Sequence, residues 1–384
     1  MGIAFKVQDD RPRKFLEWIW LRDNCRCASC VNQDTMQRNF NTFDIPADIH
    51  ATETFLEDAG VRIKWSDGHE SFYHWNWLMT YLARDWQFNP TLKGEREMFG
   101  ASIANDPPQV TYSSVMASDK GGVAELTAKI AKYGFVFVTE TPYEDPADTK
   151  RLLERIAFIR ETHYGGFYDF TPDLAMADTA YTNLALPAHT DTTYFSDPAG
   201  LQAFHLLSHT PAPGADSVKG AEGGKSLLVD GFHAAQTLKR ENPEAYKILS
   251  TKNVRWHASG NEGISIGPYR RFPVIETVEG SLFRIRWNND DRGVLPLGPA
   301  GEVVKWYNAA RKWDEILRRK DMECWIQLEP GKVLIFDNWR VLHGRSAFEG
   351  VRRICGAYIN HDDFISRWKN TNFPKEHVLQ SVRG

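Results

Sequence analysis

Residues 331–345 read GKVLIFDNWRVLHGR. The run GKVLIFD (331–337) is rich in branched and aromatic residues and predicts a strand; in FDNWRVLHGR a second buried strand ends at His343. Similar segments occur on both sides, with helices expected near 232–242 and 301–319: LQAFHLL (201–207), KSLLVD (225–230), SLFRIRWN (281–288) and RRICGAYIN (352–360). Mixed strands around a pocket, rather than regular strand–helix alternation, predict a mixed α+β protein built on a barrel or jelly roll.

Upstream of these strands, the pattern divides the chain into further parts. GFVFV (134–138) predicts a strand, and Asp145 and Pro146 predict the start of a helix with apolar residues along one side, namely Leu152, Leu153, Ile156 and Ile159. Residues 209–224, HTPAPGADSVKGAEGG, are a loop by composition.

The first third of the chain has a different sequence pattern. VRIKW (61–65) and ESFYHW (70–75) predict short strands joined by the turn SDG (66–68). Residues 84–112 are polar and proline-containing, as a connection would be. We therefore expect a small β-rich domain at 1–83, a linker at 84–112 and a larger domain at 113–384.

Charge and hydropathy exclude several classes of protein. The net charge of −4 in 384 residues provides no field that would recruit nucleic acid or an anionic membrane. The chain contains no apolar run long enough for a membrane span and no secretory signal pattern. We expect a cytoplasmic protein, or one of the mitochondrial matrix after removal of a transit peptide.

Three of the five cysteines cluster in LRDNCRCASC (21–30), at Cys25, Cys27 and Cys30. In a reducing compartment such a cluster is more typical of metal binding than of disulfides, although a redox pair is an alternative. A tetrahedral metal requires a fourth ligand, for which His50, His69 and His74 are candidates. The other two cysteines, Cys324 and Cys355, lie in apolar surroundings and are expected in the core.

The segment LPAHTDTTYF (186–195) contains His189 and Asp191. On an extended stretch both side chains point to the same face and can bind one metal, although His361 and Asp363 form a second such pair. His343 can supply the second histidine of the triad. Arg352, at the start of the next strand, can bind the far carboxylate of an α-keto acid that the metal chelates.

Several motifs occur together and in order: RETHYGG (160–166), DTAYTNLAL (178–186), HTDTTYF (189–195), GGKSLLVDGF (223–232), WNNDDR (287–292) and DNWRVLHGR (337–345). This set resembles the Fe(II)/2-oxoglutarate dioxygenases of the γ-butyrobetaine hydroxylase and trimethyllysine dioxygenase branch, in the taurine dioxygenase-like superfamily. The resemblance covers nearly the whole chain, from LRDNC to HDDF. It implies a double-stranded β-helix (jelly-roll) catalytic domain with flanking helices, preceded by a zinc-binding domain.

The resemblance also implies ligands and cofactors. His189, Asp191 and His343 would bind Fe(II), and Arg352 would bind 2-oxoglutarate; Arg353 is the alternative, but it would point to the opposite face of its strand. Ser226 would place a hydroxyl near that cosubstrate, or would only bond to the backbone. A structural Zn(II) would be held by Cys25, Cys27, Cys30 and His69. Ascorbate as reductant and a homodimer are expected from the relatives.

The substrate pocket follows from the same resemblance. A quaternary trimethylammonium cannot donate a hydrogen bond, so aromatic faces bind it best. Tyr164, Tyr168 and Tyr181 match the aromatic cage of the family, although tyrosines are often simply core residues. Asp178 would bind the α-ammonium group and Asn288 would donate hydrogen bonds; helix capping and turn formation are their alternative roles.

The resemblance implies 2-oxoglutarate- and O₂-dependent hydroxylation of Nε-trimethyllysine at C3, giving 3-hydroxytrimethyllysine, succinate and CO₂ in the first step of carnitine biosynthesis. One alternative is hydroxylation of γ-butyrobetaine, which uses the same iron chemistry. Another is a non-catalytic protein that binds methylated lysine.

Overall fold

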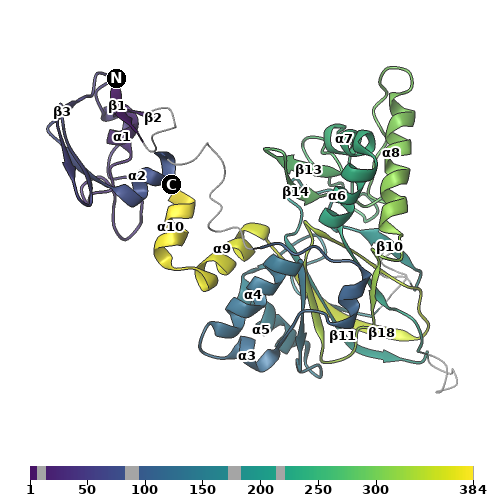
Figure 1. The fold of residues 1–384 in the computed structure, drawn as a ribbon. Coiled ribbons are helices and arrows are strands. Elements are labelled where there is room, and N and C mark those ends of the chain that lie inside the picture. Colours follow the sequence, from purple (N-terminus) through teal and green to yellow (C-terminus); the bar gives the residue numbers. More distant parts are fainter. Residues whose placement is uncertain (7–13, 83–94, 172–182, 213–220, 384) are drawn as a thin grey trace. The chain divides into compact units, whose positions relative to one another are not determined.

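The computed structural model describes residues 1–6, 14–82, 95–171, 183–212 and 221–383. The chain forms two compact units, Met1–Pro90 and Thr91–Gly384. Each has its own sheets and its own hydrophobic core (Figure 1).

The described part of the first unit is a small β structure with short helices. Its elements are β1 (Gly2–Phe5), β2 (Lys14–Glu17), α1 (Trp18–Asp23), η1 (Thr42–Asp44), β3 (Ala51–Glu57), β4 (Gly60–Trp65), β5 (Glu70–His74) and α2 (Trp75–Leu82). Strands β3, β4 and β5 form an antiparallel sheet, so the strands expected at 61–65 and 70–75 are confirmed. Gly68 has φ of 82° in the turn between β4 and β5, a conformation that favours glycine. This tight turn fixes the position of the neighbouring His69.

The second unit contains a seven-stranded sheet in the order β6–β7–β16–β11–β18–β8, with β9 also paired to β18. Its strands are β6 (Gln109–Thr111), β7 (Phe135–Thr139), β8 (Ile159–Arg160), β9 (Tyr168–Phe170), β11 (Leu201–Thr210), β16 (Val333–Asp337) and β18 (Val351–Ile359). Except for β6 and β7, which are parallel, neighbouring strands are antiparallel.

A four-stranded sheet in the order β10–β17–β12–β15 carries the other half of the core. Its strands are β10 (Leu186–His189), β12 (Ser226–Asp230), β15 (Cys324–Ile326) and β17 (Val341–Arg345). The strand expected to end at His343 continues for two more residues, because β17 pairs with β10 on one side and β12 on the other as far as Arg345. A separate hairpin joins β13 (Ile275–Val278) and β14 (Ser281–Ile285).

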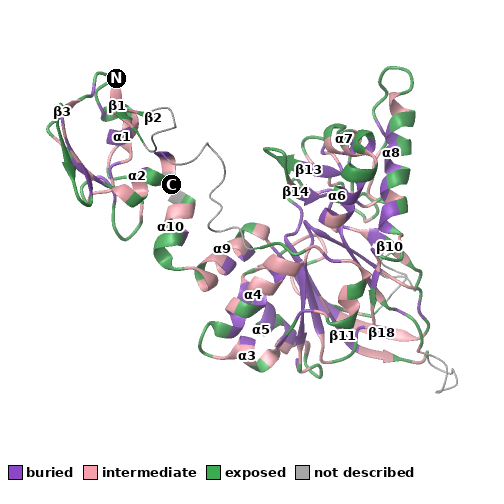
Figure 2. Cartoon of the chain, viewed as in Figure 1, coloured by how far each residue is buried: buried purple, intermediate pink, exposed green. Residues whose placement is uncertain are grey.

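Helices cover the sheets on two sides, and the strands β7, β12 and β16 are almost entirely buried (Figures 1 and 2). One group packs on Val136, Val138 and other residues of the seven-stranded sheet: α3 (Tyr112–Met116), α4 (Gly121–Tyr133), α5 (Pro146–Ile156) and α9 (His361–Asn372). The other group packs on the four-stranded sheet: α6 (Gly231–Glu241), α7 (Pro243–Thr251) and α8 (Glu302–Leu317). The chain ends in α10 (Lys375–Arg383). The mixed α/β class is confirmed.

Side-chain alternation explains why β7 is apolar from Phe135 to Val138. In β7, Val136 and Val138 contact the helices, whereas Phe135 and Phe137 point into a cluster that also contains Leu228 of β12. Successive residues of a strand face opposite sides, so a strand buried on both faces needs apolar residues at every position. Cys324 and Cys355 are fully buried, as expected.

The expected helix after GFVFV is also confirmed. The Asp145 side chain accepts a hydrogen bond from the amide of Ala147 at 2.9 Å, and Pro146 is the first residue of α5. Ile159 lies beyond this helix, in β8.

The expected linker at 84–112 is partly folded into the second unit. Residues 95–112 include η3 (Ala101–Asn105) and β6, which pairs with β7 in the large sheet. Residues 83–94 lie outside the described part of the chain.

The turn between β16 and β17 joins distant segments. The Asn338 side chain accepts a hydrogen bond from the amide of Asp191 and donates one to its carbonyl. The Trp339 indole donates to the carbonyl of Pro198 at 3.0 Å. Arg340 forms a buried ion pair with Asp230 at 2.7 Å. The DNWR sequence therefore fixes the position of the loop that follows β10.

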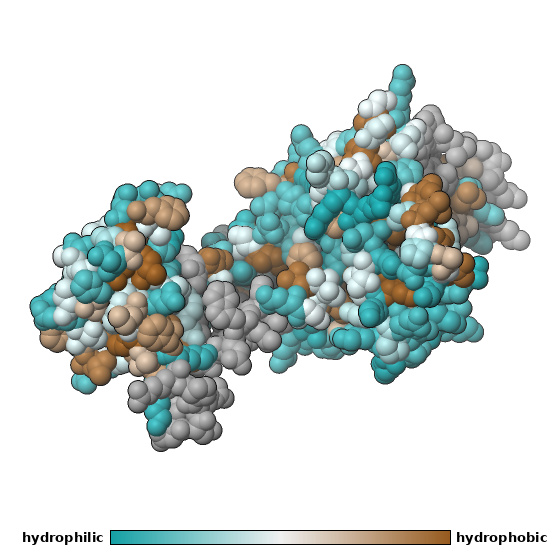
Figure 3. Space-filling view, turned by 90° about the horizontal axis from the view of Figure 1, so that it is seen from above, coloured by the Kyte–Doolittle hydropathy of each residue, from teal (hydrophilic) through white to brown (hydrophobic). Residues whose placement is uncertain are grey.

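No helix in the described parts of the chain is long and apolar enough to cross a membrane. Large exposed hydrophobic residues such as Phe158 and Tyr269 occur on the second unit. On the visible face, hydrophobic residues form separate patches among hydrophilic ones (Figure 3).

Candidate active site

His189, Asp191 and His343 lie together where β10 meets β17. His189 and His343 are directly paired across the two strands, and their ring centroids are 4.3 Å apart. Asp191 follows β10 by two residues, with Oδ1 3.2 Å from His189 Nε2 and 3.8 Å from His343 Nε2. One ligand atom from each residue lies within 4.8 Å of the others. Two imidazoles and one carboxylate are a donor set that suits Fe(II) and leaves coordination positions open.

The electrostatics of Asp191 and His343 suit a metal. Burial alone would lower the pKa of His189, but the Asp191 carboxylate beside it raises that pKa. Burial alone would raise the pKa of Asp191, but the two histidines and the Tyr358 hydroxyl hold that pKa well below its ordinary value. Burial and the neighbouring His189 lower the pKa of His343 to about 3. An ionised carboxylate and a neutral imidazole are the forms that bind metal ions.

Arg352 is the first inward-facing residue of β18. Its side chain is buried, with 2% of the residue exposed. Within the described residues, its Nε and Nη1 atoms have no hydrogen-bond partner. Burial lowers the pKa of this guanidinium to about 10, with a further contribution from Arg345. A buried guanidinium with unsatisfied donors is suited to an anionic ligand, and a carboxylate matches its planar geometry.

Arg353 lies on the opposite face of β18, as its position in the strand predicts. It is exposed and forms an ion pair with Asp169 at 2.6 Å. Of the two arginines, Arg352 alone borders the cavity described below.

Gly224 allows the close packing around Arg352. It has φ of 67°, and a Cβ atom at this position would lie 2.9 Å from Arg352 Nη1. Phe348 covers the guanidinium from another side, with its ring centroid 5.0 Å from Arg352 Cζ. The second glycine of GGKS is therefore needed for space as well as for conformation.

A cavity of about 180 Å³ brings these groups together. It is lined by the three candidate metal ligands, by Arg352 and by four other residues expected at the site, Ser226, Tyr164, Tyr168 and Asn288. The expected site residues Asp178 and Tyr181 lie outside the described residues.

The cavity-lining residues differ in how firmly they are held. Ser226 is the first residue of β12 and pairs with Arg345. The hydroxyl of Tyr168 donates to the carbonyl of Ala203 at 2.7 Å, which anchors its ring. Asn288 Oδ1 accepts from the amide of Asp290 at 3.0 Å, so Asn288 forms the turn given as its alternative role and also borders the cavity.

Three further residues escaped the sequence analysis. Tyr194, Gln202 and Tyr358 line the cavity, and all three are buried. Tyr194 stands in the quoted HTDTTYF motif, where its aromatic ring close to the histidine–aspartate pair is a signal. Gln202 and Tyr358 carry no such signal, because each lies in a strand-like segment outside the histidine–aspartate motif, among mostly apolar neighbours.

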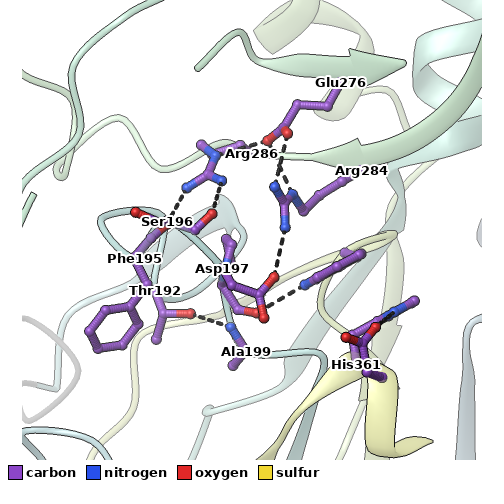
Figure 4. A network of polar contacts seen from close by, with 12 residues as sticks. Thr192, Phe195, Ser196, Asp197, Ala199, Glu276, Arg284, Arg286 and His361 are labelled. Atoms are coloured by element: carbon purple, nitrogen blue, oxygen red, sulfur yellow. Dashed lines mark hydrogen bonds and ion pairs between the residues drawn. The ribbon is translucent and has the colours of Figure 1, made fainter. Parts of the chain in front are cut away.

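A buried arginine holds the loop that carries Asp191 and Tyr194 (Figure 4). Arg286 donates to the carbonyls of Thr193, Phe195 and Ser196, the last two at 2.7 and 3.3 Å. Glu276 accepts from Arg286 at 2.9 Å and from Arg284 at 2.9 Å, and Arg284 also pairs with Asp197 at 3.3 Å. Three loop carbonyls are thereby satisfied without any secondary structure.

A second cluster of possible metal ligands lies in the first unit. Cys25, Cys27 and Cys30 have their Sγ atoms 3.3, 3.6 and 3.4 Å from His69 Nε2. Zinc ligands at 2.3 Å for sulfur and 2.0–2.1 Å for nitrogen lie about 3.6 Å apart at tetrahedral angles. The structure thus brings His69, rather than His50 or His74, to the cysteines with distances that fit zinc.

Comparison with known proteins defines the class. Residues 90–358 match the family described as Taurine catabolism dioxygenase TauD, TfdA, and residues 3–79 match the Gamma-butyrobetaine hydroxylase-like N-terminal family. The chain belongs to the TauD, TfdA family of dioxygenases. Its similarity to individual members is high. A trimethyllysine dioxygenase of Neurospora crassa is 59% identical, over 97% of this chain and 84% of the relative.

Other relatives are more distant. The mitochondrial trimethyllysine dioxygenase of Homo sapiens is 37% identical, over 91% of this chain and 81% of the relative. The gamma-butyrobetaine dioxygenase of Homo sapiens is 28% identical, over 93% and 91%. The chain is thus more similar to both trimethyllysine dioxygenases than to this gamma-butyrobetaine dioxygenase.

Proposed function

We propose that the protein is an Fe(II)- and 2-oxoglutarate-dependent dioxygenase that hydroxylates Nε-trimethyllysine at C3, giving 3-hydroxytrimethyllysine, succinate and CO₂. The observation that carries this proposal is the single cavity that joins a histidine–aspartate–histidine cluster to the buried guanidinium of Arg352. The 59% identity to a trimethyllysine dioxygenase supports the choice of substrate. The product is the one expected in the first step of carnitine biosynthesis.

The residues of the cavity have separate tasks. His189, Asp191 and His343 would hold Fe(II), and Arg352 would pair with the far carboxylate of 2-oxoglutarate, with Ser226 nearby. When bound, iron with 2-oxoglutarate and O₂ supplies the oxidising chemistry, which couples decarboxylation of the keto acid to hydroxylation of a C–H bond. No side chain has to act as a general base. The protein contributes binding, orientation and exclusion of water.

The aromatic wall suits a trimethylammonium group. Tyr164 and Tyr168, together with Tyr194, line the cavity. Each aromatic face can contribute about 0.5–2 kcal/mol of cation–π attraction, the larger values in desolvated sites. Asn288, which borders the same cavity, would hydrogen-bond the amino-acid end of the substrate. We retain Asp178 and Tyr181 as proposed substrate residues on the basis of the sequence alone.

The substrate assignment has a direct test. We expect incubation with Fe(II), 2-oxoglutarate, ascorbate and Nε-trimethyllysine to give a product heavier by one oxygen atom, detected by mass spectrometry. γ-Butyrobetaine lacks the α-ammonium group and should give at most about a tenth of the succinate, since one missing charged contact costs about 1.4 kcal/mol or more. Faster turnover of γ-butyrobetaine would reverse the assignment between these two substrates.

The finer architecture belongs to the same proposal. We propose that the seven- and four-stranded sheets form a double-stranded β-helix, and that the first unit is a structural zinc domain. Homodimer formation stays a prediction from the family. Because the human relative is named mitochondrial, we favour the mitochondrial alternative over the cytoplasm.

Zinc in the first unit can be tested with two histidine variants. His69→Ala is expected to lose bound zinc, measured by elemental analysis, and to unfold the first unit, measured by hydrogen exchange across 51–74. The physical reason is that structural zinc contributes roughly 10–16 kcal/mol of binding free energy in zinc-finger peptides. His74→Ala is the matched control, since His74 is an exposed histidine of the same hairpin and should retain zinc. Full zinc content in His69→Ala, or iron without zinc in the wild type, would contradict the zinc site.

A further inference from the structure

The two oxygens of the Asp191 carboxylate have different surroundings. Oδ1 faces the histidines, at 3.2 Å from His189 Nε2 and 3.8 Å from His343 Nε2. Oδ2 accepts a hydrogen bond from the Tyr358 hydroxyl at 2.6 Å and another from Gln202 Nε2 at 2.7 Å. Thus one oxygen faces the position of a metal and the other is saturated by the protein.

The two donors are fixed by the large sheet. Gln202 of β11 and Tyr358 of β18 are directly paired, so their side chains project to the same side. Gln202 is 2% exposed and Tyr358 is 6% exposed. On the same face of β18, six residues earlier, stands Arg352. One strand therefore carries both the proposed cosubstrate anchor and a hydroxyl that orients the proposed metal ligand.

The backbone of Asp191 is held independently of these donors. Its amide donates to Asn338 Oδ1 at 2.7 Å, and its carbonyl accepts from Asn338 Nδ2 at 3.0 Å. With the backbone fixed, rotation of the carboxylate is the freedom that remains. Gln202 and Tyr358 restrict that rotation.

We propose that Tyr358 and Gln202 are positioning residues that limit Asp191 to one metal-binding oxygen and so keep coordination positions open for 2-oxoglutarate and O₂. A carboxylate can bind a metal through one oxygen or through both. Binding through both would occupy a position that the cosubstrate needs, and two strong hydrogen bonds on Oδ2 oppose it. This inference rests on the proposed function.

The test uses Tyr358→Phe, Gln202→Leu and the double variant, each without O₂. Mn(II) replaces Fe(II), and its affinity is measured from the free-ion signal in electron paramagnetic resonance. The affinity of the Mn(II)-loaded protein for 2-oxoglutarate is then measured by calorimetry. In the double variant we expect Mn(II) to bind as tightly as in the wild type or more tightly, and 2-oxoglutarate to bind about tenfold more weakly, at the low end of outer-shell effects. Each single variant should show a smaller shift in the same direction.

Tyr112→Phe is the matched control. Tyr112 also donates its hydroxyl to a carboxylate, Asp148 Oδ1 at 2.9 Å, but its side chain does not border the cavity. We expect both affinities to stay at wild-type values in this variant.

The outcomes separate the possible roles. Weaker 2-oxoglutarate binding together with unchanged or tighter Mn(II) binding would support carboxylate positioning, because a merely structural role weakens both. Parallel losses of Mn(II) and 2-oxoglutarate affinity in the double variant, or unchanged 2-oxoglutarate affinity, would overturn the inference while the proposed function stands. Failure of the wild type to bind either ligand would instead overturn the proposed function, and the inference with it.

Discussion

His189→Ala is expected to abolish formation of both succinate and hydroxylated product. The variant loses one of the three side chains that would hold iron, and His343 and Asp191 alone cannot complete the set. The loss should exceed the roughly 10–100-fold cost of removing an outer-shell partner of a metal ligand. Product mass and Mn(II) affinity are the two measurements, so that loss of chemistry is tied to loss of the metal.

His361→Phe is the control for this variant. His361 and Asp363 form the second histidine–aspartate pair of the sequence, but His361 stacks on Trp339 with ring centroids 3.8 Å apart and parallel planes. Phenylalanine retains a flat ring there and removes both nitrogens, so activity and Mn(II) affinity should be unchanged. Retention of wild-type activity in His189→Ala would contradict the assignment of His189 to the iron site. Absence of turnover in the wild type would instead favour the alternative of a non-catalytic binding protein.

Arg352→Met is expected to raise the KM for 2-oxoglutarate by about 30-fold or more. Truncating one partner of a buried charge pair costs about 2–5 kcal/mol, and each 1.4 kcal/mol is about a factor of ten. Methionine preserves an unbranched apolar stem, so the change removes the charge and its donors with little loss of packing. Initial rates of succinate formation across 2-oxoglutarate concentrations measure the effect, and the KM for trimethyllysine serves as the internal reference.

Arg353→Met provides the matched comparison on the same strand. Arg353 is exposed and pairs with Asp169 at the surface, so its loss should leave the KM for 2-oxoglutarate nearly unchanged. Equal effects of the two substitutions, or a larger effect of Arg353→Met, would contradict the assignment of Arg352.

Local sequence predicts much of the fold. The strands at 61–65, 134–138, 201–207, 225–230 and 352–360 and the helix after Asp145 form as expected, because branched residues, caps and turn residues act over short distances. The expected end of the strand at His343 was two residues short, since pairing with β10 and β12 extends β17. Residues 95–112 belong to the second unit, where β6 pairs with β7 at the edge of the large sheet. A local sequence pattern cannot show this pairing.

The candidate site also contains residues that the sequence predicts and residues that it does not. His189, Asp191, His343 and Arg352 could be named from motifs, and alternation along β18 correctly separates Arg352 from Arg353. The two donors to the Asp191 carboxylate and the arginine that binds the following loop could not be named from motifs. Gln202, Tyr358 and Arg286 stand in strand-like segments, where a polar residue gives no hint of its partner.

By itself, the sequence determined which segments become strands and helices and which side of each strand a residue faces, because these depend on the local chain and its periodicity. It predicted that His189 and Asp191 could bind one metal, although β10 ends at His189 and Asp191 lies in the loop that follows. Only the tertiary structure decided which distant groups meet: His343 beside His189, Asn338 on the backbone of Asp191, and Arg286 on the following loop. These contacts depend on strand register and on the packing of the sheets, which the whole chain sets together.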